Sequence, residues 1–399
     1  MWTNSRTAGA SLRILNHLHH CCGHTGWRRG TDGRYRGLCR RMSSSGPPWR
    51  LLFFGSDHFA VESLKRLTSS WTSSEGIVES LEVVTLSGNV PVKKFAQQNQ
   101  LPLHSWPPDN LDGRFDVGVV VSFGCLLHET LINKFPHGIL NVHPSLLPRW
   151  RGPAPIFHTI LHGDTVTGVT IMQIRPHRFD VGPIVNQELH QVPEKCTADE
   201  LGAALATKGA HLLIDTLTTL SERLAHKRNQ SRTGETFAPK ISTSMCWIVW
   251  EEQTCDNIDC LYRAIGSRVM MTDIGWYFFK QWQTVEYHSY NPYLCCQIPL
   301  RTMWMGKTIK LLDFVGKCHI TLSDQRRRPA PGSVSYQKES NTLAVCCKDG
   351  WVGFKTVLLK KRLTAADFYN GYLHQTAEGL FVSKKRGTEA RQIRENSTL

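Results

Sequence analysis

One polar stretch in the middle of the chain, NVHPSLLPRWRG at 141 to 152, carries the residue types of an acyl-transfer site. Asn141 has an amide that donates hydrogen bonds without titrating, and His143 has an imidazole that donates or accepts near neutral pH. Side by side, they suit the stabilisation of an oxyanion. A carboxylate is then needed to orient the imidazole and move protons. We expect Asp180, on a loop that follows a strand, to supply it.

The residue types alone leave a second interpretation open. A single histidine at the end of a strand more often has a structural role than a catalytic one. No serine or cysteine in a nucleophile turn flanks these residues, so direct transfer to an acceptor is favoured over a covalent acyl-enzyme.

The elements around this stretch alternate between strand and helix, which predicts an α/β fold with a Rossmann-like, doubly wound parallel sheet. Such sheets bind ligands at the carboxyl ends of their strands. Asn141 and His143 end one strand and, two residues apart, project to the same face. The expected strands are 50–54, 79–85, 116–122 and 139–143, and the expected helices begin at Ser56-Asp57 and cover 92–99 and about 126–135.

The remainder of the predicted catalytic domain, which covers 49–225, ends in a long helix. Before it we expect a helix at 157–162, a strand at 168–174 and an antiparallel strand at 182–192. Leucines at alternating three- and four-residue steps predict one helix from Ala198 to Ala225. The polar segment 226–240 is predicted to be a linker.

From residue 241 the pattern changes to short strands separated by Gly, Asp and Pro turns, which favours a small, OB-like β-barrel over 241–385. The expected strands are 308–314, 332–337, 342–346 and 352–359, and a polar tail follows at 386–399. The segment from 241 onward carries a net charge of +7 within a total of +14. A basic barrel is a common nucleic-acid platform, although a solvated basic surface remains the alternative.

The first 48 residues form a separate compositional block. Residues 1–50 hold nine Arg, no Lys and one acidic residue. This Arg-rich, Ser-containing, acid-poor composition is typical of a mitochondrial transit peptide. A basic arm that touches nucleic acid is the alternative. No apolar run approaches the length of a membrane-spanning helix, and the 13 cysteines show no zinc-type spacing, so we expect no metal.

Three stretches, NVHPSLLPRWRGPAPI at 141–156, HGDTVTGVTIMQI at 162–174 and DVGPI at 180–184, resemble the methionyl-tRNA formyltransferases. These enzymes belong to the folate-dependent formyltransferase superfamily, whose shared Asn, His and Asp match Asn141, His143 and Asp180. Similarity covers most of 50–240 and resumes at 309–314, 331–334 and 348–372.

The resemblance implies transfer of the formyl group of 10-formyltetrahydrofolate to the α-amine of initiator methionyl-tRNA, without a metal. It places Ser145, Leu146, Leu147 and Pro148 on the folate side of the site. Arg149 and Arg151 are expected to steady folate, the acceptor end or the loop itself, and Lys93 and Lys94 to meet tRNA. The expected protein is a monomer of the mitochondrial matrix that does not bind a membrane.

Two departures from the family pattern stand out. Bacterial members carry a longer basic insertion where this chain has only LSGNV at 86–90, and the aromatic segment 268–297 has no family counterpart. Two other functions stay open: another folate-dependent formyltransferase or hydrolase, and an RNA-binding homologue with an inactive site.

Overall fold

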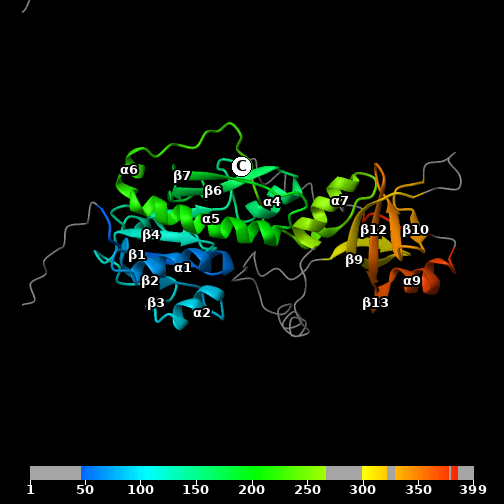
Figure 1. Cartoon of the computed structure of the whole chain (residues 1–399), viewed down its shortest axis with the longest axis horizontal. Helices are drawn as coiled ribbons and strands as arrows, with labels where there is room; N and C mark the ends of the chain where they lie inside the picture. Colours follow the sequence, from blue (N-terminus) through cyan, green and yellow to red (C-terminus); the bar gives the residue numbers. More distant parts are fainter. Residues whose placement is uncertain (1–45, 267–298, 321–328, 377–378, 385–399) are drawn as a thin grey trace, which may run out of the picture. The chain divides into compact units, whose positions relative to one another are not determined.

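The computed structural model describes residues 46–266, 299–320, 329–376 and 379–384, which build two β-sheets and their helices (Figure 1). The predicted insert at 268–297, the tail at 386–399 and all but the last three residues of the predicted leader lie outside these ranges.

The first sheet has seven strands in the order β3-β2-β1-β4-β5-β6-β7. Strands β1 to β5 pair in parallel, whereas β6 runs antiparallel to both β5 and β7. The doubly wound prediction is therefore confirmed for five strands, and the sheet as a whole is mixed. The strands are β1 (Trp49–Gly55), β2 (Val78–Val84), β3 (Leu103–His104), β4 (Val117–Val121), β5 (Ile139–His143), β6 (Val166–Gln173) and β7 (Ile184–Gln191).

The helices of this domain follow the predicted order, with two corrections. Asp57 caps α1 as expected, since its side chain accepts from the Ala60 amide. The predicted helix at about 126–135 is helical only over α3, and the rest of the segment is irregular. The helices are α1 (His58–Trp71), α2 (Pro91–Gln98), α3 (Glu129–Ile132), α4 (Pro155–Leu161), α5 (Ala198–Thr218) and α6 (Leu220–Ala225).

The single long helix predicted for 198–225 is wrong at one position. It breaks at Thr219, between α5 and α6. The hydroxyls of Thr218 and Thr219 each donate to a backbone carbonyl four residues earlier. Side-chain hydrogen bonds of this kind compete with the helical ladder and bend helices.

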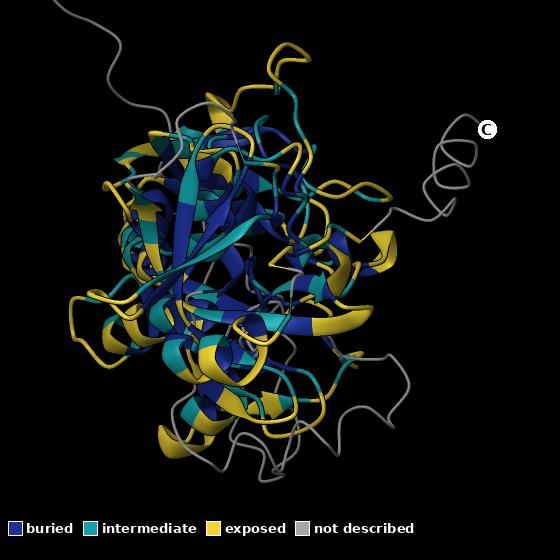
Figure 2. Cartoon of the chain, turned by 90° about the vertical axis from the view of Figure 1, so that its right-hand side faces the viewer, coloured by how far each residue is buried: buried dark blue, intermediate teal, exposed yellow. Residues whose placement is uncertain are grey.

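Apolar residues from both faces of the first sheet belong to buried clusters, and buried residues are drawn dark blue in Figure 2. On one face, Leu51 and Phe53 of β1 belong to the same core as residues of α1 and α5. On the other, Leu52 and Phe54 pack with the irregular segment that includes Phe123. Every residue of β4 is buried, as its continuous run of Val and Gly predicts.

The second sheet is antiparallel, in the order β10-β11-β12-β9-β8, with β13 paired to β12. Its two edges meet one short segment, because Val382 bridges Met303 of β8 and Leu380 bridges Ser333 beside β10. These bridges close the sheet into the predicted small barrel. The strands are β8 (Leu300–Trp304), β9 (Lys307–Cys318), β10 (Val334–Gln337), β11 (Thr342–Cys346), β12 (Trp351–Leu358) and β13 (Arg362–Thr364).

The sequence pattern missed the helical turns of this second part. Thr254 caps α7 in a reciprocal arrangement with Asn257. The reciprocal pair normally uses Glu or Gln at the third position, so the motif is easily overlooked. The turns are η1 (Thr243–Cys246), α7 (Cys255–Leu261), η2 (Tyr262–Gly266), α9 (Ala365–Phe368) and η4 (Tyr369–Leu373).

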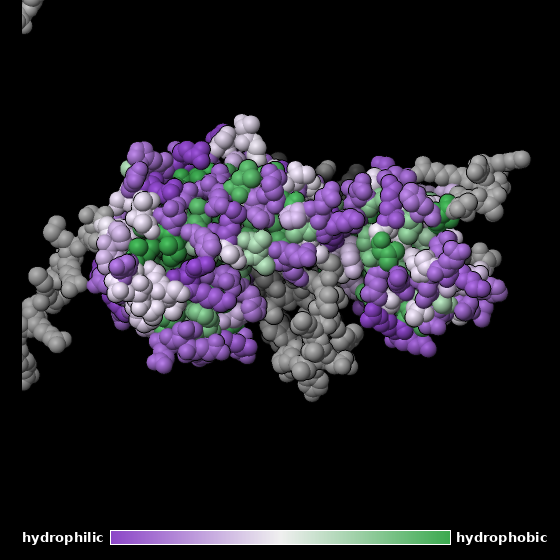
Figure 3. Space-filling view, in the orientation of Figure 1, coloured by the Kyte–Doolittle hydropathy of each residue, from purple (hydrophilic) through white to green (hydrophobic). Residues whose placement is uncertain are grey.

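The face drawn in Figure 3 is mainly hydrophilic, with apolar residues in separate patches. Within the described residues, no helix has both the length and the apolar character needed to cross a membrane.

Asp57 gives the fold a testable pH dependence. Burial raises the pKa of this carboxyl to about 7, although the Ala60 amide opposes the shift. The folded protein therefore holds a proton that the unfolded chain releases near pH 4, and stability falls as the pH rises from about 4 to 7. Between pH 5 and pH 8 the parent protein should lose about 2 kcal/mol of unfolding free energy through this carboxyl. Asp57→Asn keeps a capping side chain, and we predict that it does not show this loss.

The measurement is urea unfolding of both proteins at pH 5 and pH 8. All other titrating groups are shared, so the difference between the two proteins isolates Asp57. Parallel pH profiles would contradict a carboxyl that titrates near neutrality.

Candidate active site

The site forms where β5 ends. Asn141 and His143 lie two residues apart near its carboxyl end, between β4 and β6. His143 is buried and Asn141 is half-buried. Because alternate strand residues share a face, both side chains point to the same side of the sheet, as the sequence predicts.

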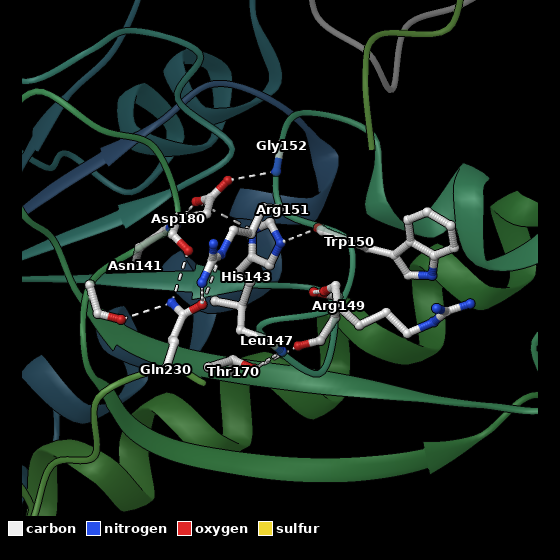
Figure 4. A network of polar contacts seen from close by, with 12 residues as sticks. Asn141, His143, Leu147, Arg149, Trp150, Arg151, Gly152, Thr170, Asp180 and Gln230 are labelled. Carbon is white, nitrogen blue, oxygen red and sulfur yellow. Dashed lines mark hydrogen bonds and ion pairs between the residues drawn. The ribbon is translucent and has the colours of Figure 1, made fainter. Parts of the chain in front are cut away.

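The structure brings Asp180 to the same place (Figure 4). The Asn141 amide donates to Asp180 Oδ1 at 3.2 Å. His143 Nδ1 lies 3.6 Å from the same oxygen, slightly beyond an ordinary hydrogen bond. Asn141 and His143 therefore both face the same oxygen of Asp180, and the three residues predicted from the sequence lie together.

The backbone fixes which nitrogen of His143 carries a hydrogen. Nε2 lies 2.9 Å from the Trp150 carbonyl oxygen, and a carbonyl can only accept. Nε2 must therefore donate, which leaves Nδ1 as the nitrogen that gains or loses a proton. Nδ1 is also the nitrogen that faces Asp180.

Two further contacts hold Asp180 in place. The Gly152 amide donates to Oδ2 at 2.9 Å, and Gln230 Nε2 donates to the Asp180 carbonyl at 2.8 Å. Asp180 has a φ of 53°, in the left-handed region that asparagine and aspartate tolerate better than most residues. The surrounding contacts therefore maintain a backbone conformation that is uncommon for a residue with a side chain.

Gly152 meets two requirements of this contact. Its φ is 115°, and a Cβ at this position would come 2.8 Å from the Ala238 carbonyl oxygen. Only glycine fits here without strain, so the amide that binds Asp180 depends on this residue.

The four residues expected on the folate side differ in accessibility. Ser145 and Leu147 are buried, and the Ser145 hydroxyl donates to the Arg149 carbonyl. Leu146 and Pro148 are half-buried, so their side chains reach solvent. Within this stretch, side-chain contact with a ligand is thus open mainly to Leu146 and Pro148.

Thr170 on β6 braces the same loop. Its hydroxyl donates to the Ser145 carbonyl at 2.6 Å and accepts from the Leu147 amide at 3.2 Å. Gln187 on β7 donates to both the Thr170 hydroxyl and the Leu147 carbonyl. The loop that follows His143 is therefore held by side chains of the neighbouring strands.

The two arginines of this loop have different surroundings. Arg149 forms a two-pronged pair with Asp164, and its guanidinium lies 4.3 Å from the centre of the Trp150 ring. Arg151 is buried and pairs with Glu235 at 2.6 Å. Both arrangements hold the loop itself, which was one of the roles expected for these residues.

The segment 226–240, predicted as a linker, crosses the catalytic domain in close contact with it. Arg228 exchanges backbone hydrogen bonds with Ile184, the Thr236 hydroxyl accepts from the Trp150 amide, and Ala238 pairs with Arg151. Most of its residues are exposed, and a few of them, among them Gln230 and Thr236, bind the site through hydrogen bonds.

Lys93 and Lys94 lie on α2, half-buried and exposed, respectively. The first turn of α2 contacts the end of β1, because the Val92 amide donates to the Ser56 carbonyl. The structure does not bring either lysine to the Asn141, His143 and Asp180 group through any contact among the described residues.

Within the described ranges, one group of side chains has the spacing of a metal site. It consists of Cys255, Cys347 and Asp349 of the C-terminal part, with the two sulfurs 3.4 Å apart. Burial and the neighbouring Cys347 thiol raise the pKa of the Cys255 thiol. Asn141, His143 and Asp180 do not belong to this group.

Sequence reasoning missed Trp150, Gly152 and Gln230 as parts of the site. Trp150 and Gly152 contribute backbone groups, which cannot be predicted from the type of residue. Gln230 lies 50 positions beyond Asp180, in a segment whose composition signals a linker. A glycine within a polar loop indicates a positive φ, so only this feature of Gly152 could have been predicted.

Comparison with known proteins places this site in a family. Residues 55–217 match the formyl transferase family, and residues 294–373 match the formyl transferase C-terminal domain. The chain is 49% identical to mitochondrial methionyl-tRNA formyltransferase of Bos taurus over 387 residues, which cover 91% of each protein. It is 51% identical to the Homo sapiens protein of the same name, over 88% of this chain and 82% of that protein.

A solved structure shares the fold. WlaRD, a sugar 3N-formyl transferase crystallised with dTDP and 5-N-formyl-THF, superposes with a TM-score of 0.50 at 15% identity. The match covers 77% of this chain and 98% of that one.

The different settings of the two arginines lead to a prediction. Arg151→Ala should lower the free energy of unfolding by about 3 kcal/mol, because it removes a buried guanidinium that binds both Glu235 and Gln230. Arg149→Ala should cost less, since its guanidinium is 41% exposed and Asp164 keeps the Trp150 indole N–H as a partner. Chemical denaturation of both variants beside the parent protein is the measurement, and equal losses would count against the buried role of Arg151.

Proposed function

The chain belongs to the mitochondrial methionyl-tRNA formyltransferases, and from this membership we propose that formyl transfer to methionyl-tRNA takes place at Asn141, His143 and Asp180. The observation that carries the proposal is the convergence of the Asn141 amide and His143 Nδ1 on Asp180 Oδ1. An amide, an imidazole and a carboxylate lie together at the carboxyl end of a parallel strand. Sheets of this kind bind their ligands at that end, which favours a catalytic role over a structural one.

In the proposed reaction, the α-amine of the esterified methionine attacks the formyl carbon. Negative charge then builds on the formyl oxygen, which requires hydrogen-bond donors. One N–H of the Asn141 amide points to Asp180, so the second N–H of that amide group can donate to this oxygen. His143 provides a second donor when Nδ1 is protonated.

Asp180 would keep the His143 ring in its working orientation. The Trp150 carbonyl keeps Nε2 as a donor, and Nδ1 therefore faces the carboxylate. As the tetrahedral intermediate collapses, the amine loses a proton and the departing nitrogen gains one. Asp180 and His143 Nδ1 are the groups placed to carry that proton.

The formyl donor belongs to the folates, and we propose 10-formyltetrahydrofolate. The loop 145–148 follows His143 directly, so a donor bound against Leu146 and Pro148 would place its formyl group near the imidazole. Both side chains reach solvent, while Ser145 and Leu147 keep the loop in shape from beneath. No metal enters this chemistry.

We further propose that the barrel binds the tRNA backbone, and one pair of residues favours this. Arg301 of β8 and Lys310 of β9 lie directly opposite each other, an arrangement that like charges destabilise. Arg301 Nε is buried without a hydrogen-bond partner among the described residues. Burial and the Arg301 charge lower the pKa of Lys310. A phosphate beside these two cationic side chains would offset the repulsion between their charges.

The proposal also covers the location of the protein, the role of two lysines and the oligomeric state. The leader at 1–48 would direct the protein to the mitochondrial matrix, since the Bos taurus and Homo sapiens relatives are named mitochondrial. Lys93 and Lys94 would approach the tRNA acceptor end from α2. The protein would act as a monomer with initiator methionyl-tRNA and folate as its only substrates.

One assay separates the proposal from the two alternatives. The protein is incubated with 10-formyltetrahydrofolate and methionyl-tRNA, and the products are analysed. Formyl-methionyl-tRNA supports the proposal, free formate indicates a hydrolase, and neither product indicates an inactive RNA-binding homologue.

The catalytic roles lead to a mutational prediction. His143→Ala and Asp180→Ala should remain folded and lose roughly 100- to 1000-fold in rate, the usual cost of removing one oxyanion donor. The measurement is single-turnover formylation, with circular dichroism to verify the fold. Near-normal turnover in either variant would end the assignment of that residue.

The proposed phosphate site predicts a change in salt dependence. A plot of log affinity for tRNA against log salt concentration should lose about one unit of slope for each phosphate contact removed. We expect such a loss for Arg301→Gln and for Lys310→Gln, with little change for Lys65→Gln, whose side chain pairs with Glu62 on α1. Unchanged slopes in the two barrel variants would place the tRNA elsewhere.

A further inference from the structure

Gln230 lies at the junction of the two loops that form the site (Figure 4). Its Nε2 donates to the carbonyls of Asp180 and Gly182, both at 2.8 Å. Its Oε1 accepts from Arg151 Nε at 2.9 Å and from Arg151 Nη2 at 2.7 Å. Both N–H groups of the amide and its oxygen are therefore used, and all of them bind the site.

The two ends of this side chain act on different parts of the site. The oxygen binds Arg151, which belongs to the loop after His143. The amide nitrogen binds the loop that carries the Asp180 carboxylate. Gln230 itself comes from the segment 226–240, so a third part of the chain joins the two loops.

The Asp180 loop has few buried side chains on the side that precedes Asp180. His177, Arg178 and Phe179 are exposed, and Phe179 is 62% exposed although it is apolar. His177 and Asp180 both have positive φ, which costs energy in residues with a side chain. Apolar packing is therefore sparse on this side of Asp180, whereas Gly182 and Pro183 on the other side are buried, next to the carbonyls that Gln230 binds.

We propose that Gln230 is a positioning residue for formyl transfer, whose amide nitrogen fixes the Asp180 loop so that the carboxylate stays beside His143 Nδ1. This inference rests on the proposed function, because it assigns Gln230 a role only through Asp180. A displacement of about 1 Å at a reacting group can cost about 100-fold in rate, so a small shift of this loop has a measurable effect.

The decisive variant is Gln230→Glu, which separates the two ends of the side chain. The carboxylate keeps an acceptor for Arg151 and strengthens that contact through its charge. It removes both donors and turns an oxygen toward the carbonyls of Asp180 and Gly182. We expect kcat to fall about 10- to 100-fold, with KM for methionyl-tRNA within about 3-fold and the unfolding temperature preserved.

Glu235→Gln is the matched control. Glu235 binds Arg151 through the same guanidinium, and among the described residues it makes no hydrogen bond or ion pair with the Asp180 loop. This variant should lower stability while kcat stays within about 3-fold of the parent value. If both variants lose kcat in proportion to their loss of stability, Gln230 is a structural residue and the proposal is wrong.

A double-mutant cycle tests whether the effect passes through Asp180. In an Asp180→Ala protein, Gln230→Glu should cause almost no further loss of kcat, because the group that Gln230 positions is gone. Additive losses would overturn the inference, and so would a Gln230→Glu protein with parental kcat. Should Gln230→Glu fail to fold, Gln230→Met, which removes the same donors without adding charge, takes its place in the cycle.

This design keeps the two failures apart. If Asp180→Ala alone retains near-normal turnover, the proposed catalytic site is wrong. If Asp180→Ala is inactive while Gln230→Glu is unaffected, the catalytic site stands and only the role of Gln230 fails.

Discussion

The Asp180 carboxylate is the constraint on which the arrangement of the site depends. Its side chain is only 11% exposed, and a charge removed from water is costly unless it is paired and hydrogen-bonded. The Asn141 amide, the Gly152 amide and the His143 ring surround its two oxygens. Each partner comes from the end of β5 or from the loop after it, so satisfying one carboxylate brings the two loops together.

This arrangement is supported by a second layer of contacts. Trp150 and Asp180 both have positive φ, at 60° and 53°, and such conformations persist only where the surroundings fix them. The segment 226–240 provides much of that support, through Thr236 against Trp150 and Gln230 against Asp180. The chemistry proposed for three side chains therefore relies on a part of the chain that precedes the barrel.

The sequence predicted those features that depend on local pattern. The buried β4 run, the Asp57 cap and the shared face of Asn141 and His143 all follow from residue periodicity and capping chemistry. It also predicted the barrel, although the closing segment at 380–382 gives no recognisable strand signal. These features require information from only a few neighbouring residues, which is why they could be read in advance.

Features that depend on distant partners could not be predicted in this way. The burial of Arg151 is decided by Glu235 and Gln230, about 80 positions later in the chain. The role of 226–240 is hidden for the same reason, because a polar segment looks alike whether water or the protein satisfies it. The Trp150 carbonyl and the Gly152 amide are backbone groups, whose direction depends on loop conformation rather than on residue identity.

Nitrogen-15 NMR of the histidine side chains, with His143 assigned by substitution, tests the central claim most directly. In the unliganded protein, the account predicts that the neutral His143 ring carries its hydrogen on Nε2, which donates to the Trp150 carbonyl, and that Nδ1 is bare. An Nε2 signal typical of a bare nitrogen would contradict it. The Trp150 carbonyl could then not orient the ring, and Nδ1 would not be the proton carrier beside Asp180.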